Sequence, residues 1–547
     1  MVACSQPLAS EAGMRILQQG GTAADAAVAM AAALNVTEPC STGIGGDAFM
    51  LWFDAKTKEV TAMLGCGRAP AGLSLETVRA KGIKGLELPP TSALCVTVPG
   101  APMLWDDVVK KFGKLSLKQV LQPAIELAEN GFPVSPLTAA AWAQLMKQLT
   151  HQGGEGIKSL LQPDGSAPRP GQIQKNANLA QTFRSVAEHG AKEGFYKGRI
   201  AEAIIKALRE RGGVMEPTDL AAHFSSLEQP IRTTYRGYNI YEVPPPTQGI
   251  AALVAMNNLE GYTGLGQLHW GSAEHLHQTI ESVRLAFSDV LAYNADPHVV
   301  PVPVAALLDK GYAAERRKQV LSPDKAAKME PGKLKVHPDL QASPTRGGAD
   351  TVYFGVVDGE GNACSFINSN YMGFGSGIAP EGCGFTLQNR GHNFILDPDH
   401  PNCLAPGKRP YHTIIPGLAT DAAGQLFCTF GVMGAFMQPQ GHLQVISNML
   451  DFNMEPQAAL DAPRFCLAGV DSAIGPSCVR DSSVQLEEGF SEEAAEGLRK
   501  LGHKVEANVG NYRRAVFGRG QIIHRNAQTG VLWGGSDPRG DGQVLGW

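Results

Sequence analysis

The sequence predicts an α+β fold. Helical patterns with clear ends occupy most of the chain up to about residue 320, and paired strand patterns dominate it after residue 350. Between them, 322–350 is rich in lysine, proline and glycine and lacks apolar periodicity, which is typical of an exposed connector. Helices followed by antiparallel strands indicate packed layers of sheet and helix.

The chain is expected to begin with two helices and a hairpin. The first helix covers 10–19 and is followed by a pair of glycines. The second starts at Thr22, with Asp25 placed three residues on to complete a capping box. Strands at 48–53 and 59–64 then form a hairpin.

The elements expected further on change from helices to strands. Helices at 117–130 and 199–210 each end in glycine, and a single strand covers 238–243. After the connector, strands at 351–357 and 362–369 are joined by a turn that contains two glycines. The remaining expected elements are hairpins that pair 414–420 with 425–430 and 518–524 with 531–535, and a helix over 491–501.

The composition argues against several classes of partner. A net charge of −5 and a pI near 6.3 give no electrostatic reason to bind nucleic acid or an acidic membrane. No apolar run reaches the roughly 20 residues that span a bilayer, and the first residues lack the pattern of a secretory signal. We therefore expect a cytoplasmic protein. Its ten cysteines are scattered without a C-x-x-C pair, as free thiols would be.

The motifs that the sequence lacks narrow the chemistry. It has no G-x-x-x-x-G-K-[ST] phosphate loop, no G-x-S-x-G elbow and no H-E-x-x-H zinc motif. His275 and His277 lie two residues apart on an expected helix, so they point to different faces and are poor joint ligands of a metal. We expect neither a metal nor an organic cofactor.

One junction fits a self-activating catalyst. The glycine-containing loop 346–350 leads directly into a strand whose first residue is Thr351. A threonine at the start of a strand is ordinary, because β-branched residues favour strands. Cleavage between Asp350 and Thr351 would, however, free an α-amine that could act as the base for the hydroxyl of the same residue. The junction therefore also fits an N-terminal nucleophile.

Motifs in order along almost the whole chain carry a resemblance to one family. They are Gly20-Gly21-Thr22-Ala23-Ala24-Asp25, Ser41-Thr42-Gly43-Ile44-Gly45-Gly46-Asp47, Val98-Pro99-Gly100, Tyr235-Arg236-Gly237-Tyr238, Gly375-Ser376-Gly377-Ile378, Lys408-Arg409-Pro410, Ala462-Pro463-Arg464-Phe465 and Ser536-Asp537-Pro538-Arg539. With these motifs and the strand pair that opens at Thr351, the sequence resembles the γ-glutamyltranspeptidases, also called γ-glutamyltransferases or glutathione hydrolases. They are N-terminal nucleophile hydrolases.

The resemblance implies a fold and a maturation step. The fold is a four-layer αββα sandwich. Autocatalytic cleavage between Asp350 and Thr351 gives a helix-rich large subunit, 1–350, which contributes strands to the sandwich, and a small catalytic subunit, 351–547. The reaction is cleavage of γ-glutamyl amides, of glutathione or a related compound, through an acyl-enzyme on Thr351 that is released to water or an amine acceptor.

The resemblance also assigns roles to residues of the catalytic centre. Ser369 stands where the family has a hydroxyl that contacts the nucleophile. Gly434 and Ala435 stand where two backbone N–H groups bind the oxyanion. Since alanine retains its N–H, an oxyanion hole remains available if the backbone there tolerates a Cβ.

The substrate pocket implied by the resemblance departs from the family pattern. Cys66 replaces an arginine that binds the α-carboxylate, and Arg68 stands two residues further on. Asn393 replaces an acidic receptor of the α-ammonium, while Arg390 replaces a glutamine and adds a donor fork for a carboxylate. The other changes are Tyr371 for an asparagine and His412-Thr413 for a serine pair.

The sequence therefore predicts an autoprocessing threonine hydrolase or acyltransferase that acts on a small-molecule γ-glutamyl amide. The pocket changes favour an alternative with the same mechanism, a glutaryl or cephalosporin-type acylase. An alternative of another class is an uncleaved, inactive scaffold protein, against which the intact Thr351 and its cleavage loop argue. The expected partners are the two subunits of one precursor and a water or amine acceptor, and a homo-oligomer is compatible with the sequence.

Overall fold

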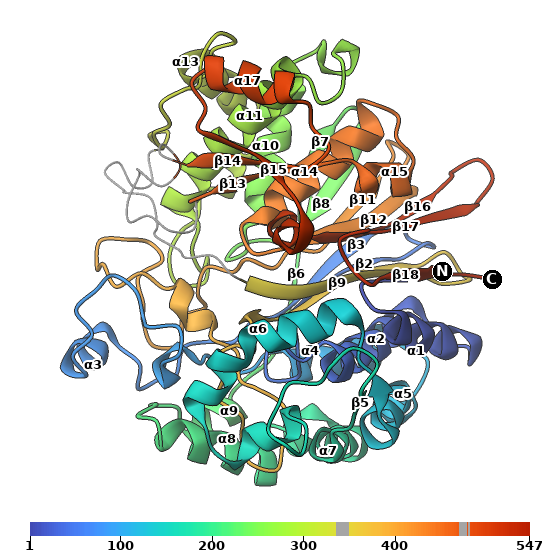
Figure 1. The fold of residues 1–547 in the computed structure, drawn as a ribbon, viewed down its shortest axis with the longest axis vertical. Helices are drawn as coiled ribbons and strands as arrows, with labels where there is room; N and C mark the ends of the chain where they lie inside the picture. The colour runs from blue at the N-terminus through green and yellow to red at the C-terminus, as the bar shows by residue number, and fades with distance from the viewer. Residues whose placement is uncertain (335–348, 470–478, 480–481) are drawn as a thin grey trace.

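Two facing β-sheets with helices on both outer sides form the core of the protein. The computed structural model describes residues 1–334, 349–469, 479 and 482–547. Within these ranges the two large sheets have seven and six strands, and helices cover the outer face of each (Figure 1). The order helix, sheet, sheet, helix confirms the predicted four-layer αββα sandwich and the α+β class.

The first sheet is antiparallel and joins strands from both ends of the chain. Its order is β18-β1-β9-β10-β2-β3-β6. The strands are β1 (Val2–Cys4), β2 (Asp47–Phe53), β3 (Val60–Gly65), β6 (Ser226–Glu228), β9 (Ala349–Val357), β10 (Ala363–Met372) and β18 (Gln543–Leu545). The helices on its side of the molecule are α1 (Pro7–Gln18), α2 (Ala23–Thr37), α4 (Ala101–Phe112), α5 (Leu117–Asn130), α6 (Pro136–Gln152), α7 (Ala177–Gly194), α8 (Gly198–Arg209) and α9 (Pro217–Ala221), with the small pair β4 (Phe132–Pro133) and β5 (Ile173–Gln174).

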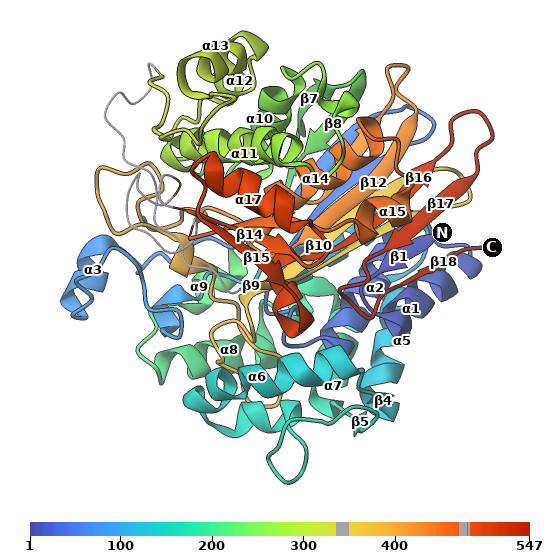
Figure 2. The same ribbon diagram turned by 45° about the horizontal axis from the view of Figure 1, so that its top comes forward.

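The second sheet is also antiparallel, in the order β17-β16-β12-β11-β8-β7. Its strands are β7 (Ile231–Tyr235), β8 (Tyr238–Glu242), β11 (Gly417–Thr420), β12 (Leu426–Met433), β16 (Arg519–Arg525) and β17 (Leu532–Ser536). The helices over it, green to red in Figure 2, are α10 (Gly249–Glu260), α11 (Ala273–Tyr293), α12 (Val304–Leu307), α13 (Lys310–Val320), α14 (Met437–Leu450), α15 (Pro456–Asp461) and α17 (Glu492–Lys500). A small third sheet holds β13 (Phe465–Ala468), β14 (Ser483–Glu487) and β15 (Val505–Val509), and α3 (Leu75–Ala80) lies at one side.

Alternation along β9 decides which of its side chains face the space between the sheets. Val352 and Phe354 pack with the helices of the first layer, whereas Tyr353 and Val357 pack between the two sheets. Because successive side chains of a strand point to opposite faces, Thr351 shares the side of Tyr353. The candidate nucleophile is therefore buried between the sheets.

Most predicted elements are present with small shifts at their ends. Thr22 and Asp25 form the predicted capping box of α2. The strand predicted to start at Thr351 begins two residues earlier, so β9 runs through the predicted cleavage bond. Half of the described strands were not predicted, namely β1, β4, β5, β6, β7, β13, β14, β15 and β18. One of them, β7, has alternating burial and pairs with the predicted strand β8.

The two predicted subunits share the sheets. The first sheet combines β1, β2, β3 and β6 with β9, which crosses residue 350, and with β10 and β18, which follow it. The second combines β7 and β8 with strands that follow residue 350. Part of the predicted connector, 335–348, lies outside the described residues. In its described part Ala327 is held by α11, where its N–H donates to Glu281 and its carbonyl accepts from Arg284.

Two further expectations concern the chain as a whole. In the part that the structure describes, no helix has the length and apolar character needed to cross a membrane. Nine cysteines are described, and none of them forms a disulfide.

Candidate active site

The hydroxyls of Thr351 and Ser369 are hydrogen-bonded at the ends of two neighbouring strands. Thr351 Oγ1, on β9, lies 2.9 Å from Ser369 Oγ, on β10, and both residues are buried. The pairing of the two strands shifts between Asn368 and Tyr371, so a bulge carries Ser369 out of the regular register. Bulges of this kind re-aim a side chain next to a site. Tyr371, at φ 76°, closes the bulge by donating its N–H to Ser369 Oγ at 2.8 Å.

Arg390 joins this pair to Thr413, in the segment that precedes β11. It lies on the short 3₁₀ helix η4 (Arg390–Asn393) and is fully buried. Its Nη1 donates to Thr413 Oγ1 at 2.7 Å, and its Nη2 donates to Ser369 Oγ at 3.4 Å. The guanidinium also lies 4.3 Å from the ring centre of Tyr371, a cation–π contact. Burial lowers the pKa of Arg390 to about 10, so the side chain is charged at neutral pH.

Two donors converge on the hydroxyl that contacts the nucleophile. Ser369 Oγ accepts one bond from the Tyr371 N–H and a longer one from Arg390. In the bond between Ser369 Oγ and Thr351 Oγ1, either hydroxyl can be the donor.

Gly434 and Ala435, the predicted oxyanion donors, lie between β12 and α14. Both have positive φ, 135° and 50°, so the backbone does tolerate the Cβ of Ala435. Among the described residues no acceptor is recorded for either N–H. Gln248 connects this turn to Thr413, the partner of Arg390. Its Nε2 donates to the carbonyl of Ala435 at 2.7 Å and to that of Thr413 at 2.6 Å.

Two other predicted pocket residues lie apart from these contacts. Asn393, also on η4, donates from Nδ2 to Tyr411 O at 3.1 Å, and its buried Oδ1 has no partner among the described residues. The guanidinium of Arg68 lies 4.2 Å from the ring centre of Phe224. No contact of Arg68 with Arg390 is recorded in the described part of the chain, so its role in the pocket stays a prediction.

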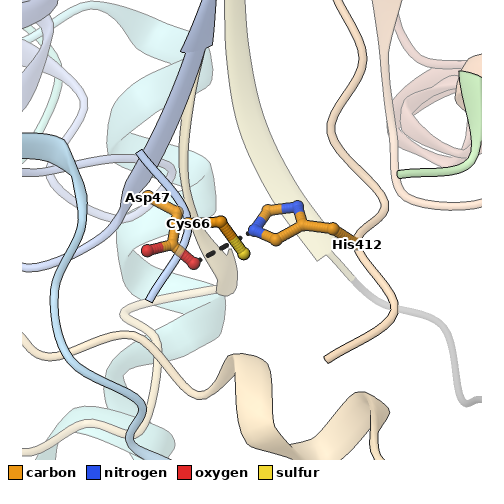
Figure 3. A group of neighbouring side chains, drawn as sticks. All are labelled: Asp47, Cys66 and His412. Carbon is orange, nitrogen blue, oxygen red and sulfur yellow. Dashed lines mark hydrogen bonds and ion pairs between the residues drawn. The ribbon is translucent and has the colours of Figure 1, made fainter. Parts of the chain in front are cut away.

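The structure adds Asp47, which was not among the predicted site residues, and Cys66, which was named only as the replacement of an arginine. Asp47 starts β2 directly opposite Ser369 in the sheet. Its Oδ2 lies 3.0 Å from His412 Nε2, and Cys66 Sγ lies beside that pair (Figure 3). Since His412 Nδ1 accepts weakly from the Ile414 N–H, the ring proton is on Nε2 and donates to Asp47. The sequence signal for Asp47 is its position at the end of the Gly45-Gly46-Asp47 motif.

The charges of this group are set by burial. Burial raises the pKa of Asp47 to about 7, against the opposing effects of Arg390 and of two backbone N–H donors, Gly67 and Gly100. Burial also lowers the pKa of His412 well below its usual value, so the ring is neutral. A protonated or weakly ionised Asp47 leaves the positive charge of Arg390 largely uncompensated.

The same three side chains are the donor set that could hold a metal ion in the described part of the chain. Asp47, Cys66 and His412 offer one oxygen, one sulfur and one nitrogen within 4.8 Å of one another. The tautomer inferred from the Ile414 contact has its proton on Nε2, the nitrogen nearest to Asp47. A ligating nitrogen must have its lone pair free, so metal binding at Nε2 would require the proton to move to Nδ1 and the bond from Ile414 to break.

The sandwich and the threonine at the end of a central strand define the N-terminal nucleophile class of hydrolases, and comparisons with known proteins give the family. The model of the family "Gamma-glutamyltranspeptidase" matches residues 9–547. The glutathione hydrolase-like YwrD proenzyme of Bacillus subtilis is 35% identical, with 100% of this chain and 98% of the relative covered. The acylase ACY 1 proenzyme of Pseudomonas sp. strain V22 is 33% identical, with 92% and 87% covered.

A solved structure extends the likeness to three dimensions. The cephalosporin acylase from Bacillus halodurans superposes with a TM-score of 0.89 at 43% identity, over 100% of this chain and 95% of that one. The chain therefore belongs to the γ-glutamyltranspeptidase family, as the resemblance implied.

Proposed function

We propose that the protein is an autoprocessing threonine amidohydrolase or acyltransferase whose acyl group ends in a carboxylate, of the glutaryl class. The observation that carries the proposal is Arg390, a buried guanidinium hydrogen-bonded to the residue that contacts the nucleophile, Ser369, and to Thr413. Its Nε has no partner among the described residues. A buried cation with an unused donor suits a substrate carboxylate.

Maturation is proposed to produce the catalyst from the uncut chain. Thr351 Oγ1 attacks the carbonyl carbon of Asp350, the peptide nitrogen leaves as the α-amine of Thr351, and water hydrolyses the resulting ester. The products are the subunits 1–350 and 351–547. Since β9 runs through this bond and both sheets contain strands from both sides of it, cleavage frees a chain end without separating the halves.

The mature enzyme then uses one residue as nucleophile and base. The α-amine of Thr351 takes the hydroxyl proton while Oγ1 attacks the amide carbonyl, and the same proton passes to the departing amine. Ser369 donates to Oγ1 and holds it in position. The N–H groups of Gly434 and Ala435 stabilise the negative oxygen, and water or an amine then breaks the Thr351 ester.

The acyl pocket is formed by side chains that are remote from one another in sequence. Arg390 binds the terminal carboxylate, with the Tyr371 ring beneath it and Thr413 fixing its orientation. Asn393 supplies an amide where a γ-glutamyl enzyme would need a negative charge for the α-ammonium. The names of the acylase ACY 1 and cephalosporin acylase relatives support an acyl substrate of this kind.

Cleavage of γ-glutamyl amides is the second candidate. The buried Oδ1 of Asn393 has no partner in the described residues, and the buried carboxylate of Asp47 is near enough to Arg390 for each to affect the other's pKa, so both are acceptors that suit an α-ammonium. The relative from Bacillus subtilis, whose name describes it as glutathione hydrolase-like, supports this candidate.

Kinetics on two matched anilides separate the candidates. We expect kcat/KM of the mature protein to be at least about tenfold higher for glutaryl-4-nitroanilide than for γ-glutamyl-4-nitroanilide. Asn393→Asp should lower this ratio at least about tenfold, because it restores a charge for the ammonium. Equal or higher activity on the γ-glutamyl compound, with no response to Asn393→Asp, would establish the second candidate instead.

A further inference from the structure

A cleft next to the nucleophile lies outside the acyl pocket. It has a volume of about 520 Å³ and runs between α6 and the 3₁₀ helix η5 (Asn511–Phe517). Its lining includes Ser41, Ala141, Met433, Tyr512 and Arg514. The volume falls in the range of small-molecule sites.

Packing between the two sheets places Thr351 next to this cleft. A Cβ on Gly355 would lie 2.6 Å from Thr429 Oγ1, and a Cβ on Gly431 would contact the ring of Tyr353. Gly355 on β9 therefore lies opposite Thr429 on β12, and Tyr353, two residues earlier on β9, lies opposite Gly431, two residues later on β12. Since side chains on one face recur every two residues, the next step sets Thr351 opposite Met433, which lines the cleft.

The other side of the cleft is bound to the strand that carries Ser369. The carbonyl of Ser41 accepts from the N–H of Asn370 at 3.3 Å, and Asn370 follows Ser369 on β10. Met433 in turn precedes Gly434. The cleft thus adjoins the strand that carries Ser369 and the turn that carries the oxyanion donors, and Arg390 is not part of its lining. The amine half of the amide would extend into it.

The walls of the cleft differ in chemistry. The α6 wall is apolar where Leu137, Ala140 and Ala141 line it, and the rest of the lining includes three arginines and two glutamates. Two of the arginines are in ion pairs, Arg519 with Glu38 and Arg539 with Glu487. Arg514 donates from Nε to Glu487 Oε1 at 2.7 Å, and no partner of its two terminal nitrogens is recorded among the described residues. Tyr512, two-thirds exposed, lies at the mouth. An aromatic body with a carboxylate matches both walls.

We infer that this cleft binds the leaving or accepting amine, and that Arg514 selects amines with an aromatic or apolar body and a carboxylate. The inference rests on the proposed role of Thr351 in amide cleavage. It concerns the amine half of the substrate, whereas Arg390 concerns the acyl half. The role of Arg514 is therefore testable with the acyl group held constant.

The test compares two amides of the same acyl group, glutarate, whose amines are 4-aminobenzoate and the nearly isosteric, uncharged 4-aminobenzamide. The mature enzyme should prefer the aminobenzoate amide at least about tenfold in kcat/KM. Arg514→Gln should bring this ratio close to one. The matched control is Arg513→Gln, the preceding residue, which pairs with Glu506 and does not line the cleft. It should leave the ratio unchanged.

A second variant tests the space rather than the charge. Ala141→Trp should fill the cleft, and should lower kcat/KM at least about tenfold for both aromatic amides but not for glutaramate, whose leaving group is ammonia. A wild-type ratio near one, or a ratio that Arg514→Gln does not change, overturns the inference while glutaramate hydrolysis upholds the proposed function. Loss of all amide hydrolysis by the wild-type protein overturns both.

Discussion

Thr351 Oγ1 lies 2.9 Å from Ser369 Oγ, across two strands that are adjacent in the same sheet. The contact depends on the bulge in β10, because that bulge frees Ser369 from the regular register. Through Ser369 the nucleophile is also connected to Arg390 and, beyond it, to Thr413. The proposed catalytic group and the proposed acyl receptor are therefore parts of one hydrogen-bond network.

Self-cleavage is expected before Thr351. The purified protein should yield fragments of about 37 and about 21 kDa, the shares of the 58.0 kDa chain on either side of the cleaved bond. Intact-mass spectrometry under denaturing conditions and N-terminal sequencing check this, since the smaller fragment must begin Thr-Val-Tyr-Phe. Thr351→Ala should remain one chain without amidase activity. An uncut and inactive wild-type protein would point to the scaffold alternative.

Ser369→Ala should lower kcat by about 10²- to 10³-fold, the size of effect seen when one hydrogen bond to a reacting oxygen is removed. KM should change little, because the acyl receptor remains. Ser365→Ala is the matched control. It removes a hydroxyl of the same strand that contacts Tyr353 and Gly417 rather than the nucleophile. Equal losses in the two variants would indicate a purely structural role for Ser369.

Arg390→Gln should remove the preference for a terminal carboxylate. A charge-assisted hydrogen bond contributes about 1.5–3 kcal/mol, so the ratio of kcat/KM for glutaryl over pentanoyl anilide should fall by about 10- to 150-fold. The pentanoyl compound lacks only the carboxylate, so it reports any general damage to the site. The extent of self-cleavage serves as the measure of correct folding. If the glutaryl to pentanoyl ratio of kcat/KM is unchanged in Arg390→Gln, the terminal carboxylate binds to a group other than Arg390.

Asp47 should make the choice of acyl group depend on pH. Its pKa is raised to about 7 by burial, so the side chain is neutral below pH 7 and negative above it. The negative form offsets Arg390, which weakens the binding of a carboxylate and favours an ammonium. The glutaryl to γ-glutamyl ratio of kcat/KM should therefore fall as pH rises from about 6 to about 8.

Titration of the Thr351 α-amine changes kcat/KM for both substrates by the same factor, so its effect cancels in the glutaryl to γ-glutamyl ratio. Asp47→Asn should flatten the dependence, because the amide does not ionise in this range. A wild-type ratio that is constant between pH 6 and 8, or one that rises, would contradict the assignment of Asp47 to the acyl pocket.

The sequence by itself determined the elements whose signals are local. The Thr22–Asp25 capping box and the helix of 117–130 depend on residues within one or a few turns, and the structure contains both. The motifs along the chain were enough to predict the family, and the loop before Thr351 marked a candidate nucleophile. Strand patterns predicted nine of the eighteen described strands, and the nine that were missed, β7 among them, are mostly very short.

Only the tertiary structure decided which of the candidate residues meet. Asp47 and His412 are 365 residues apart, and no pattern along the chain indicates that they form a hydrogen bond. No pattern along the chain indicates the hydrogen bond between Arg390 and Ser369 either. Nor does one indicate that the guanidinium of Arg68 lies over the ring of Phe224. The physical reason is that periodicity and caps encode contacts a few residues apart, whereas a pocket is formed where sheets and loops from distant segments pack together.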